Sequence, residues 1–138
     1  MAKLDVKKVE RFSIEVPNEP GQGAQVLGAI AAGGADLIAA WGYPYGGEGS
    51  AKIEVIPADS AVFRAAAKKA KIKVKKECAA FCVTGRNKVG ALADALSRLA
   101  ARGINVHAVQ AIGVGSKFGA LIEVASKDVR KAANALGA

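Results

Sequence analysis

Two short turns carry the residue types best suited to ligand binding, because each places asparagine and glycine where a predicted strand passes into a predicted helix. The first reads Asn18-Glu-Pro-Gly21 and the second Asn87-Lys-Val-Gly90. Backbone N–H groups at the start of a helix have no intrahelical acceptor and lie at its positive end, so they suit a carboxylate. Glycine also lets a ligand approach the backbone closely. The candidate donors are the N–H groups of Gly21, Gln22 and Gly23 in the first turn and of Gly90, Ala91 and Leu92 in the second.

A ligand that also carries an α-ammonium group needs acceptors beside these donors. The candidate acceptors are the amide oxygens of Asn87 and Asn105, or the carboxylate of Asp36. A second interpretation is that Asn18 and Asn87 simply cap the helices that follow, since asparagine is a favoured N-cap residue.

The turn occurs twice because the chain is an internal repeat. A shift of 69, half of the 138 residues, aligns the sequence with itself without a gap. Glycines at one fixed offset and a shared Ile-Glu-Val triplet are the strongest matches. The identical pairs include Phe12/Phe81, Asn18/Asn87, Gly21/Gly90, Gly34/Gly103, Ile53/Ile122, Glu54/Glu123 and Val55/Val124.

Each repeat predicts the same elements. In the first, period-two alternation and turn residues predict strands at 11–16, 35–43, 50–56 and 71–75, with one helix ending at Gly33-Gly34 and another capped by Asp59. In the second, strands are expected at 80–84, 104–114 and 118–125, with one helix ending at Gly103 and another capped by Ser126 or Asp128. The order β-α-β-β-α-β is that of ferredoxin-like folds. The sequence therefore predicts an α+β protein of two ferredoxin-like units, residues 9–76 and 77–138, side by side, each an antiparallel sheet with helices on one face.

The second unit ends before a fourth strand. Residues 3–8, Lys-Leu-Asp-Val-Lys-Lys, resemble residues 71–76, so the N-terminal segment is a candidate for the missing strand. Without it, one sheet edge would be unpaired and prone to association. The alternative is a frayed tail.

At these turns the chain resembles the ACT domain, a small regulatory module of amino-acid metabolism. The resemblance rests on the strand, turn and helix, and on Gly34-Ala-Asp36-Leu and Gly103-Ile-Asn105-Val at the second strands, and it covers about residues 10–138. It implies a free amino acid bound at an interface between paired units. Serine-sensing members use two asparagines, at the positions of Asn87 and Asn105. Each unit departs from that pattern at one position. In the first unit Asp36 replaces the second asparagine, and in the second unit Val89 replaces the proline that the first unit has as Pro20.

Other features have competing interpretations. Trp41, Tyr43 and Tyr45 alternate, so they share one strand face and either cover a ligand or pack at an interface. Six lysines between residues 68 and 76 could bind RNA, but they mostly alternate with apolar residues, which is typical of a solvated edge strand. The single histidine, His107, has no evident activating partner.

Composition narrows the class of protein. The formal charge of +8, with mixed signs and 51% hydrophobic residues, indicates a folded chain. No apolar run reaches the roughly 20 residues of a membrane span, and residues 1–9 do not resemble a signal peptide. Cys78 and Cys82, four apart on a strand, would have Cα atoms about 13 Å apart, too far for a disulfide. We therefore expect a cytoplasmic protein without metal or cofactor.

Together these observations predict a regulatory protein, not an enzyme, that binds a free amino acid or related metabolite and forms a homodimer. Two alternatives are a basic module that binds nucleic acid and a dimerisation domain that binds no ligand.

Overall fold

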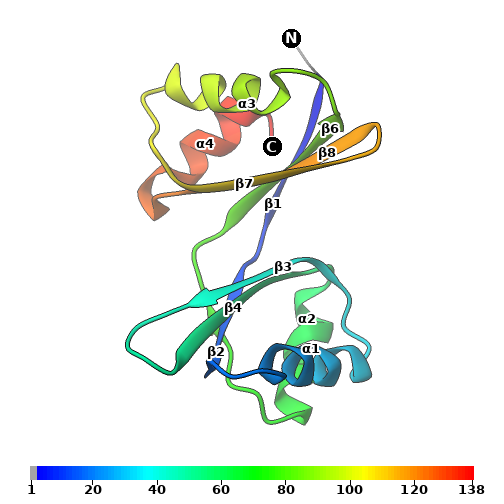
Figure 1. Ribbon diagram of the computed structural model, residues 1–138. Coiled ribbons are helices and arrows are strands. Elements are labelled where there is room, and N and C mark those ends of the chain that lie inside the picture. The colour runs from blue at the N-terminus through cyan, green and yellow to red at the C-terminus, as the bar shows by residue number, and fades with distance from the viewer. Residues whose placement is uncertain (1–2) are drawn as a thin grey trace. The chain divides into compact units, whose positions relative to one another are not determined.

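Two four-stranded antiparallel sheets, each with two helices on one face, make up the computed structural model, which describes residues 3–138 (Figure 1). The first unit comprises Glu10–Glu77, and the second comprises Cys78–Ala138 together with residues 3–9. No helix within residues 3–138 is long and apolar enough to cross a membrane.

The first unit follows the expected β-α-β-β-α-β order. Its elements are β2 (Phe12–Pro17), α1 (Gln22–Ala32), β3 (Leu37–Pro44), β4 (Ser50–Pro57), α2 (Ser60–Lys69) and β5 (Lys75–Lys76), with sheet order β3-β4-β2-β5. Phe12 and Ile14 alternate toward the helices, and the rings of Phe12 and Phe63 lie 5.0 Å apart between their centroids. Burial of one face of an alternating strand against helices is what the sequence pattern predicted.

The second unit repeats this order with a different last strand. Its elements are β6 (Ala80–Arg86), α3 (Ala91–Ala100), β7 (Val106–Val114), β8 (Lys117–Val124), the 3₁₀ turn η1 (Ser126–Asp128), α4 (Val129–Leu136) and β1 (Leu4–Val9), with sheet order β1-β6-β8-β7. β1 pairs antiparallel with β6 from Leu4 opposite Gly85 to Val9 opposite Ala80. Leu4 and Val6 pack against the core, so the N-terminal strand occupies the fourth position of this sheet.

The observed helix caps test one interpretation of the asparagines. The N-cap residues of α1 and α3 are Gly21 and Gly90, at φ 88° and 84°, and neither helix has a side-chain cap. Glycine adopts this left-handed conformation without steric cost. The interpretation that Asn18 and Asn87 cap these helices is therefore wrong. For the second helices, Asp59 caps α2 as predicted, accepting from the N–H groups of Ala61 and Val62, whereas Asp128 occupies the N-cap position of α4 without a side-chain hydrogen bond.

The fourth strand of the first unit is shorter than the predicted 71–75. Only Lys75–Lys76 form β5, opposite Ser13 and Phe12. Lys71 adopts φ 58°, and the N–H groups of Lys71 and Ile72 donate to the carbonyls of Lys68 and Ala67 at the end of α2. Completing the helix C-terminus thus uses the residues that alternation assigned to a strand.

The ungapped alignment of the two repeats is also wrong for their third strands. Phe12 lies opposite Val55, but its counterpart Phe81 lies opposite Ile122, so β4 and β8 are equivalent at an offset of 67. The β7–β8 hairpin is two residues shorter than the β3–β4 hairpin. The segment before α4, which contains η1, is two residues longer than the segment before α2, so the second helices align again at an offset of 69. A shift of two residues keeps every side chain on its own face of a strand, so the apolar pattern does not reveal it.

Candidate functional site

Both units have a hollow at the same place, between the start of the first helix and the hairpin that follows the second strand. The hollow beside α3 measures about 250 Å³ and the one beside α1 about 300 Å³. Of the predicted site residues, Asn87, Gly90, Ala91 and Leu92 line the first, and Asn18, Gln22 and Gly23 line the second.

Asn87 joins the turn before α3 to the β7–β8 hairpin. Its backbone N–H donates to the carbonyl of Ser116 (2.8 Å) and its side-chain Nδ2 to that of Gly115 (3.2 Å). With Nδ2 used in this way, Oδ1 is the atom that can accept from a ligand. The hairpin therefore fixes the orientation of the amide.

The first turn of α3 supplies the donors of this hollow. Leu92 and Ala93 are the second and third helical residues, whose N–H groups have no acceptor within the helix. The N–H of Ala91 instead donates to the carbonyl of Lys88 at 3.2 Å. The remaining wall is mainly apolar, formed by Ala111, Ile112, Gly113 and Phe118.

The hollow beside α1 is more polar. The N–H of Asn18 donates to the carbonyl of Gly49 (2.8 Å), and that of Gln22 is directed to the carbonyl of Glu19 at 3.4 Å. Glu19, Tyr43 and Lys52 also line this hollow. The two hollows therefore occupy the same position in their units but differ in the polarity of their linings.

Five predicted site positions do not line these hollows. Gly21 is the N-cap residue of α1 but is not part of the lining beside it. Pro20 and Val89 are exposed, Val89 completely. Asp36 and Asn105 precede β3 and β7, beyond the C-terminal ends of α1 and α3. Since α3 has 10 residues and so a length of about 15 Å, Asn87 and Asn105 of one unit lie at opposite ends of a helix. Sequence spacing cannot show this separation.

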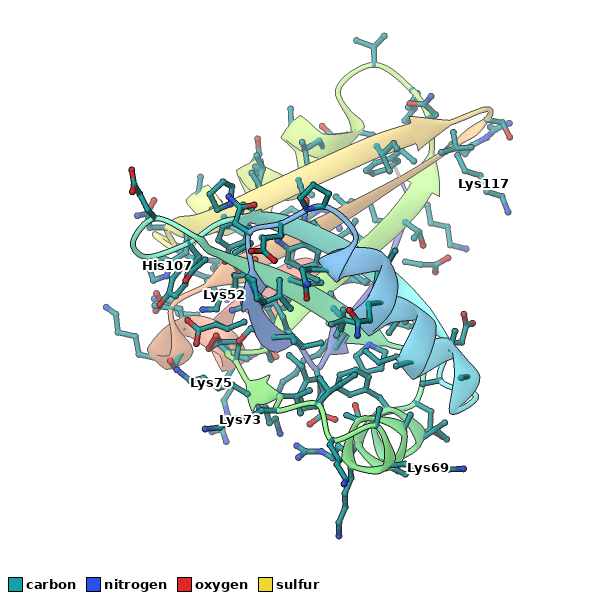
Figure 2. All side chains as sticks on the ribbon, turned by 60° about the horizontal axis from the view of Figure 1, so that its bottom comes forward. Lys52, Lys69, Lys73, Lys75, His107 and Lys117 are labelled. Carbon is teal, nitrogen blue, oxygen red and sulfur yellow. The ribbon has the colours of Figure 1, made fainter. Side chains whose placement is uncertain are left out.

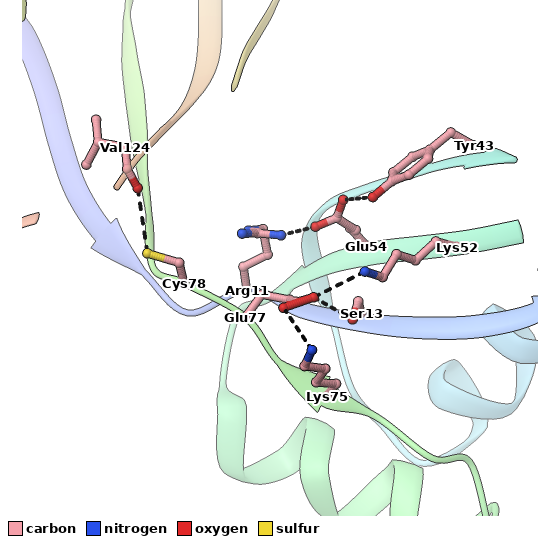
Figure 3. Close-up of polar contacts among 9 residues, drawn as sticks. All are labelled: Arg11, Ser13, Tyr43, Lys52, Glu54, Lys75, Glu77, Cys78 and Val124. Atoms are coloured by element: carbon pink, nitrogen blue, oxygen red, sulfur yellow. Dashed lines mark hydrogen bonds and ion pairs between the residues drawn. The ribbon is translucent and has the colours of Figure 1, made fainter. Parts of the chain in front are cut away.

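A buried charge cluster on the helix-free face of the first sheet, the face opposite its helices, was not anticipated. Arg11 Nη1 donates to Glu54 Oε1, and the hydroxyl of Tyr43 donates to Glu54 Oε2 (Figure 3). Arg11 and Glu54 are 9% and 6% exposed. Ala80, Leu121 and Ile112 hold the equivalent positions of the second unit, so the cluster is a property of one unit alone.

Glu77 lies in a second polar group on that face. Its Oε2 accepts from Ser13 Oγ at 3.0 Å and from Lys52 Nζ at 3.4 Å, and Lys75 lies 4.0 Å from Oε1 (Figure 3). Burial by itself would raise the pKa of Glu77, but the Ser13 and Lys52 hydrogen bonds and the lysine charges lower it overall. Lys52 Nζ also lies 4.2 Å from the centre of the Tyr45 ring, a cation–π contact.

The features that suggested RNA binding or catalysis are arranged unfavourably for either. Lys68, Lys69, Lys71, Lys73, Lys75 and Lys76 are all exposed, and Figure 2 labels three of them extending from the ribbon. Phe12, Phe81 and Phe118 are buried against the helices, so they offer no stacking surface. His107 is exposed on β7. Within residues 3–138, no three His, Cys, Asp or Glu side chains gather to hold a metal ion.

Comparison with known proteins gives no sequence match and a clear structural one. No protein-family model matches the chain, and no curated protein does. The solved structure of protein BT0572 from Bacteroides thetaiotaomicron is similar with TM-score 0.79 and 20% identity, covering 96% of this chain and 88% of that one. The regulatory subunit of aspartate kinase from Thermus thermophilus is similar with TM-score 0.65 and 15% identity, covering 98% and 95%. The chain therefore has the fold of tandem ACT regulatory domains, over nearly its whole length.

Proposed function

We propose that this chain is a regulatory protein that binds a free amino acid in the hollow beside α3. The observation that carries the proposal is the meeting of a fixed asparagine amide with unpaired helix N–H groups in one cavity. The likeness to an aspartate kinase regulatory subunit supports regulation and not catalysis as the role.

The hollow offers complementary groups for each part of an amino acid. The carboxylate accepts from the N–H groups of Leu92 and Ala93, where the helix dipole and Lys88 favour negative charge. The ammonium group donates to Asn87 Oδ1. Ala111, Ile112 and Gly113 leave room for a small apolar side chain.

Asn105 joins such a site only from another copy of the unit, because its own α3 separates it from Asn87. We propose a homodimer as the source of that copy. β7, which follows Asn105, is the edge strand of its sheet, and Val109 at its middle is 40% exposed. An edge strand with apolar side chains favours association. A bound amino acid would then stabilise the assembled form and so control the partner that recognises it.

The proposed setting is the reducing cytoplasm, with no cofactor. Cys78 and Cys82 are both free thiols, which supports a reducing compartment. Burial raises the pKa of the Cys82 thiol despite the nearby charge of Lys7, so this cysteine is a poor nucleophile.

Thermal unfolding of the full chain with each of the twenty amino acids at about 10 mM tests the proposal. A ligand with Kd near 0.1 mM should add about 2.7 kcal/mol, several degrees in Tm for a protein of this size. The shift should be selective, lost in Asn87→Ala and retained in Asn18→Ala. A flat panel for the wild-type chain, or equal shifts in wild type and Asn87→Ala, would contradict it. Dimerisation with a flat panel would favour a structural dimerisation domain.

A further inference from the structure

A larger hollow, about 920 Å³, lies on the helix-free face of the second sheet. This volume is within the range of small-molecule sites. Three residues border both this hollow and the one beside α3: Lys88, Ile112 and Phe118. Arg86, Lys117 and Gly119 border only the larger one.

The floor of this hollow is a glycine. Gly119 lies on β8 between Thr84 of β6 and Ile112 of β7, and a Cβ built on it would meet no atom within 4 Å. The equivalent residue of the first unit is Lys52, whose side chain lies over the Tyr45 ring and bonds to Glu77. The first unit has a smaller hollow of about 570 Å³ at this place, lined by Lys52 and Tyr45, whereas no side chain rises from the floor of the second.

Cations concentrate around this floor. Arg86 and Lys117 are directly opposite on β6 and β8, and Lys3 and Lys88 complete the set, with Asp5 as the one lining carboxylate. Like charges directly opposite in a sheet are destabilising. Within residues 3–138, none of these four cations forms an ion pair. A bound polyanion would relieve the repulsion.

The spacing and the neighbouring side chains define the ligand. Lys3, Arg86 and Lys117 belong to three adjacent chain segments, and two strand spacings amount to about 10 Å, comparable to a chain of phosphates. Arginine also matches phosphate with two parallel hydrogen bonds. Beside the cations, Ile112 and Val114 present exposed apolar side chains on the same face.

We propose that this hollow binds a nucleoside polyphosphate, with its phosphates on Lys3, Arg86 and Lys117 and its nucleoside against Ile112 and Val114. The lining favours this ligand over single-stranded nucleic acid. Phe118, the one aromatic residue of the lining, is 7% exposed and packs in the core, so no stacking surface is present.

Calorimetric titration of the full chain with ATP, tripolyphosphate and adenosine tests the proposal. ATP should bind most tightly, tripolyphosphate more weakly and adenosine weakest, and the affinity for ATP should fall as salt rises. Arg86→Gln and Lys117→Gln should each weaken ATP binding about tenfold, the value of one charged hydrogen bond. Gly119→Val should weaken it at least as much by filling the floor while leaving Tm unchanged or higher, because the residue is not at positive φ and valine favours strands.

Two control variants separate this site from the rest of the molecule. Lys69→Gln removes an exposed lysine of α2 and should leave ATP affinity unchanged within about twofold. Asn87→Ala should also leave ATP affinity unchanged, so the proposal stands or fails separately from amino-acid binding. The absence of saturable ATP binding up to about 5 mM would overturn the proposal. Equal ATP affinity in wild type and Arg86→Gln would also overturn it. Tripolyphosphate binding as tightly as ATP would overturn the nucleoside assignment, and an oligonucleotide that binds tighter than ATP at these residues would assign the surface to nucleic acid instead.

Discussion

The side-chain amide of Asn87 lies against the backbone of Gly113, where any larger residue would displace it. A Cβ at position 113 would be 2.8 Å from Asn87 Nδ2 and 3.2 Å from Oδ1. Gly113 is not at positive φ, so its backbone conformation is open to any residue. A larger residue is disfavoured there because its Cβ would clash with the side-chain amide of Asn87. A glycine on β7 and an asparagine before α3 thus define one wall of the proposed amino-acid site together.

Gly113→Ala should therefore abolish the amino-acid-dependent rise in Tm while changing the stability of the free protein by less than about 1 kcal/mol, since Asn87 is exposed and its amide can rotate away at the loss of one hydrogen bond. Paired thermal scans with and without ligand measure both effects. Gly28→Ala, on α1 with no atom within 4 Å of its Cβ, is the matched control and should keep the full ligand response. A normal response in Gly113→Ala would contradict the assigned role of Asn87.

Removing one partner of the Arg11–Glu54 pair should lower the free energy of unfolding more than replacing both partners. Arg11→Ala alone leaves a buried carboxylate without its cation and should cost about 3 kcal/mol. The double variant Arg11→Ala/Glu54→Leu copies the Ala80 and Leu121 of the second unit and should cost clearly less than the single one. Urea unfolding of the three proteins measures the difference. A double variant less stable than Arg11→Ala would show that the pair stabilises the fold.

Glu77 should make the first unit sensitive to acid. Its pKa is lower folded than unfolded, so its contribution to stability is complete above the unfolded value near 4.5 and is lost as pH falls through the folded pKa. Unfolding free energy should therefore fall more steeply below pH 4.5 in wild type than in Glu77→Gln. Denaturant titrations from pH 3 to 6 compare the slopes, and parallel pH profiles would rule out a stabilising ionised Glu77.

The N-terminal strand should stabilise the second unit through its apolar face. Leu4→Ala and Val6→Ala remove side chains that pack on the core and should each cost about 1 to 2 kcal/mol, less than for fully buried residues. Lys7→Ala, on an exposed position of the same strand, should change stability by less than about 0.5 kcal/mol. Chemical denaturation distinguishes these outcomes, and equal effects of all three variants would contradict the packing of β1.

The fold could be predicted from sequence because strand alternation, helix periodicity and terminal glycines all agreed. The shifted register of β8 could not, since a change of two residues leaves Ile122 and Val124 equally well buried. The shortened β5 was hidden because Ile72 and Val74 are partly buried, as in a strand, although their backbone follows the end of α2. For the proposed site, one turn motif predicted that Asn87 and the start of α3 lie together, and they line one hollow. The separation of Asn105, the role of Gly113 and the Arg11–Glu54 pair depend on cross-strand neighbours, which no local pattern encodes.

The central claim is tested most directly by the amide resonances of ¹⁵N-labelled protein during titration with the amino acid that raises Tm most. Binding beside α3 predicts the largest, saturable shifts at the backbone amides of Leu92 and Ala93 and at the side-chain amide of Asn87. The amides of Gly23 and Ala24, at the same positions of α1, are the internal reference and should shift less. Saturable shifts at Leu92 and Ala93 would locate the ligand there. Shifts concentrated elsewhere, or none with any of the twenty amino acids at about 10 mM, would contradict the account.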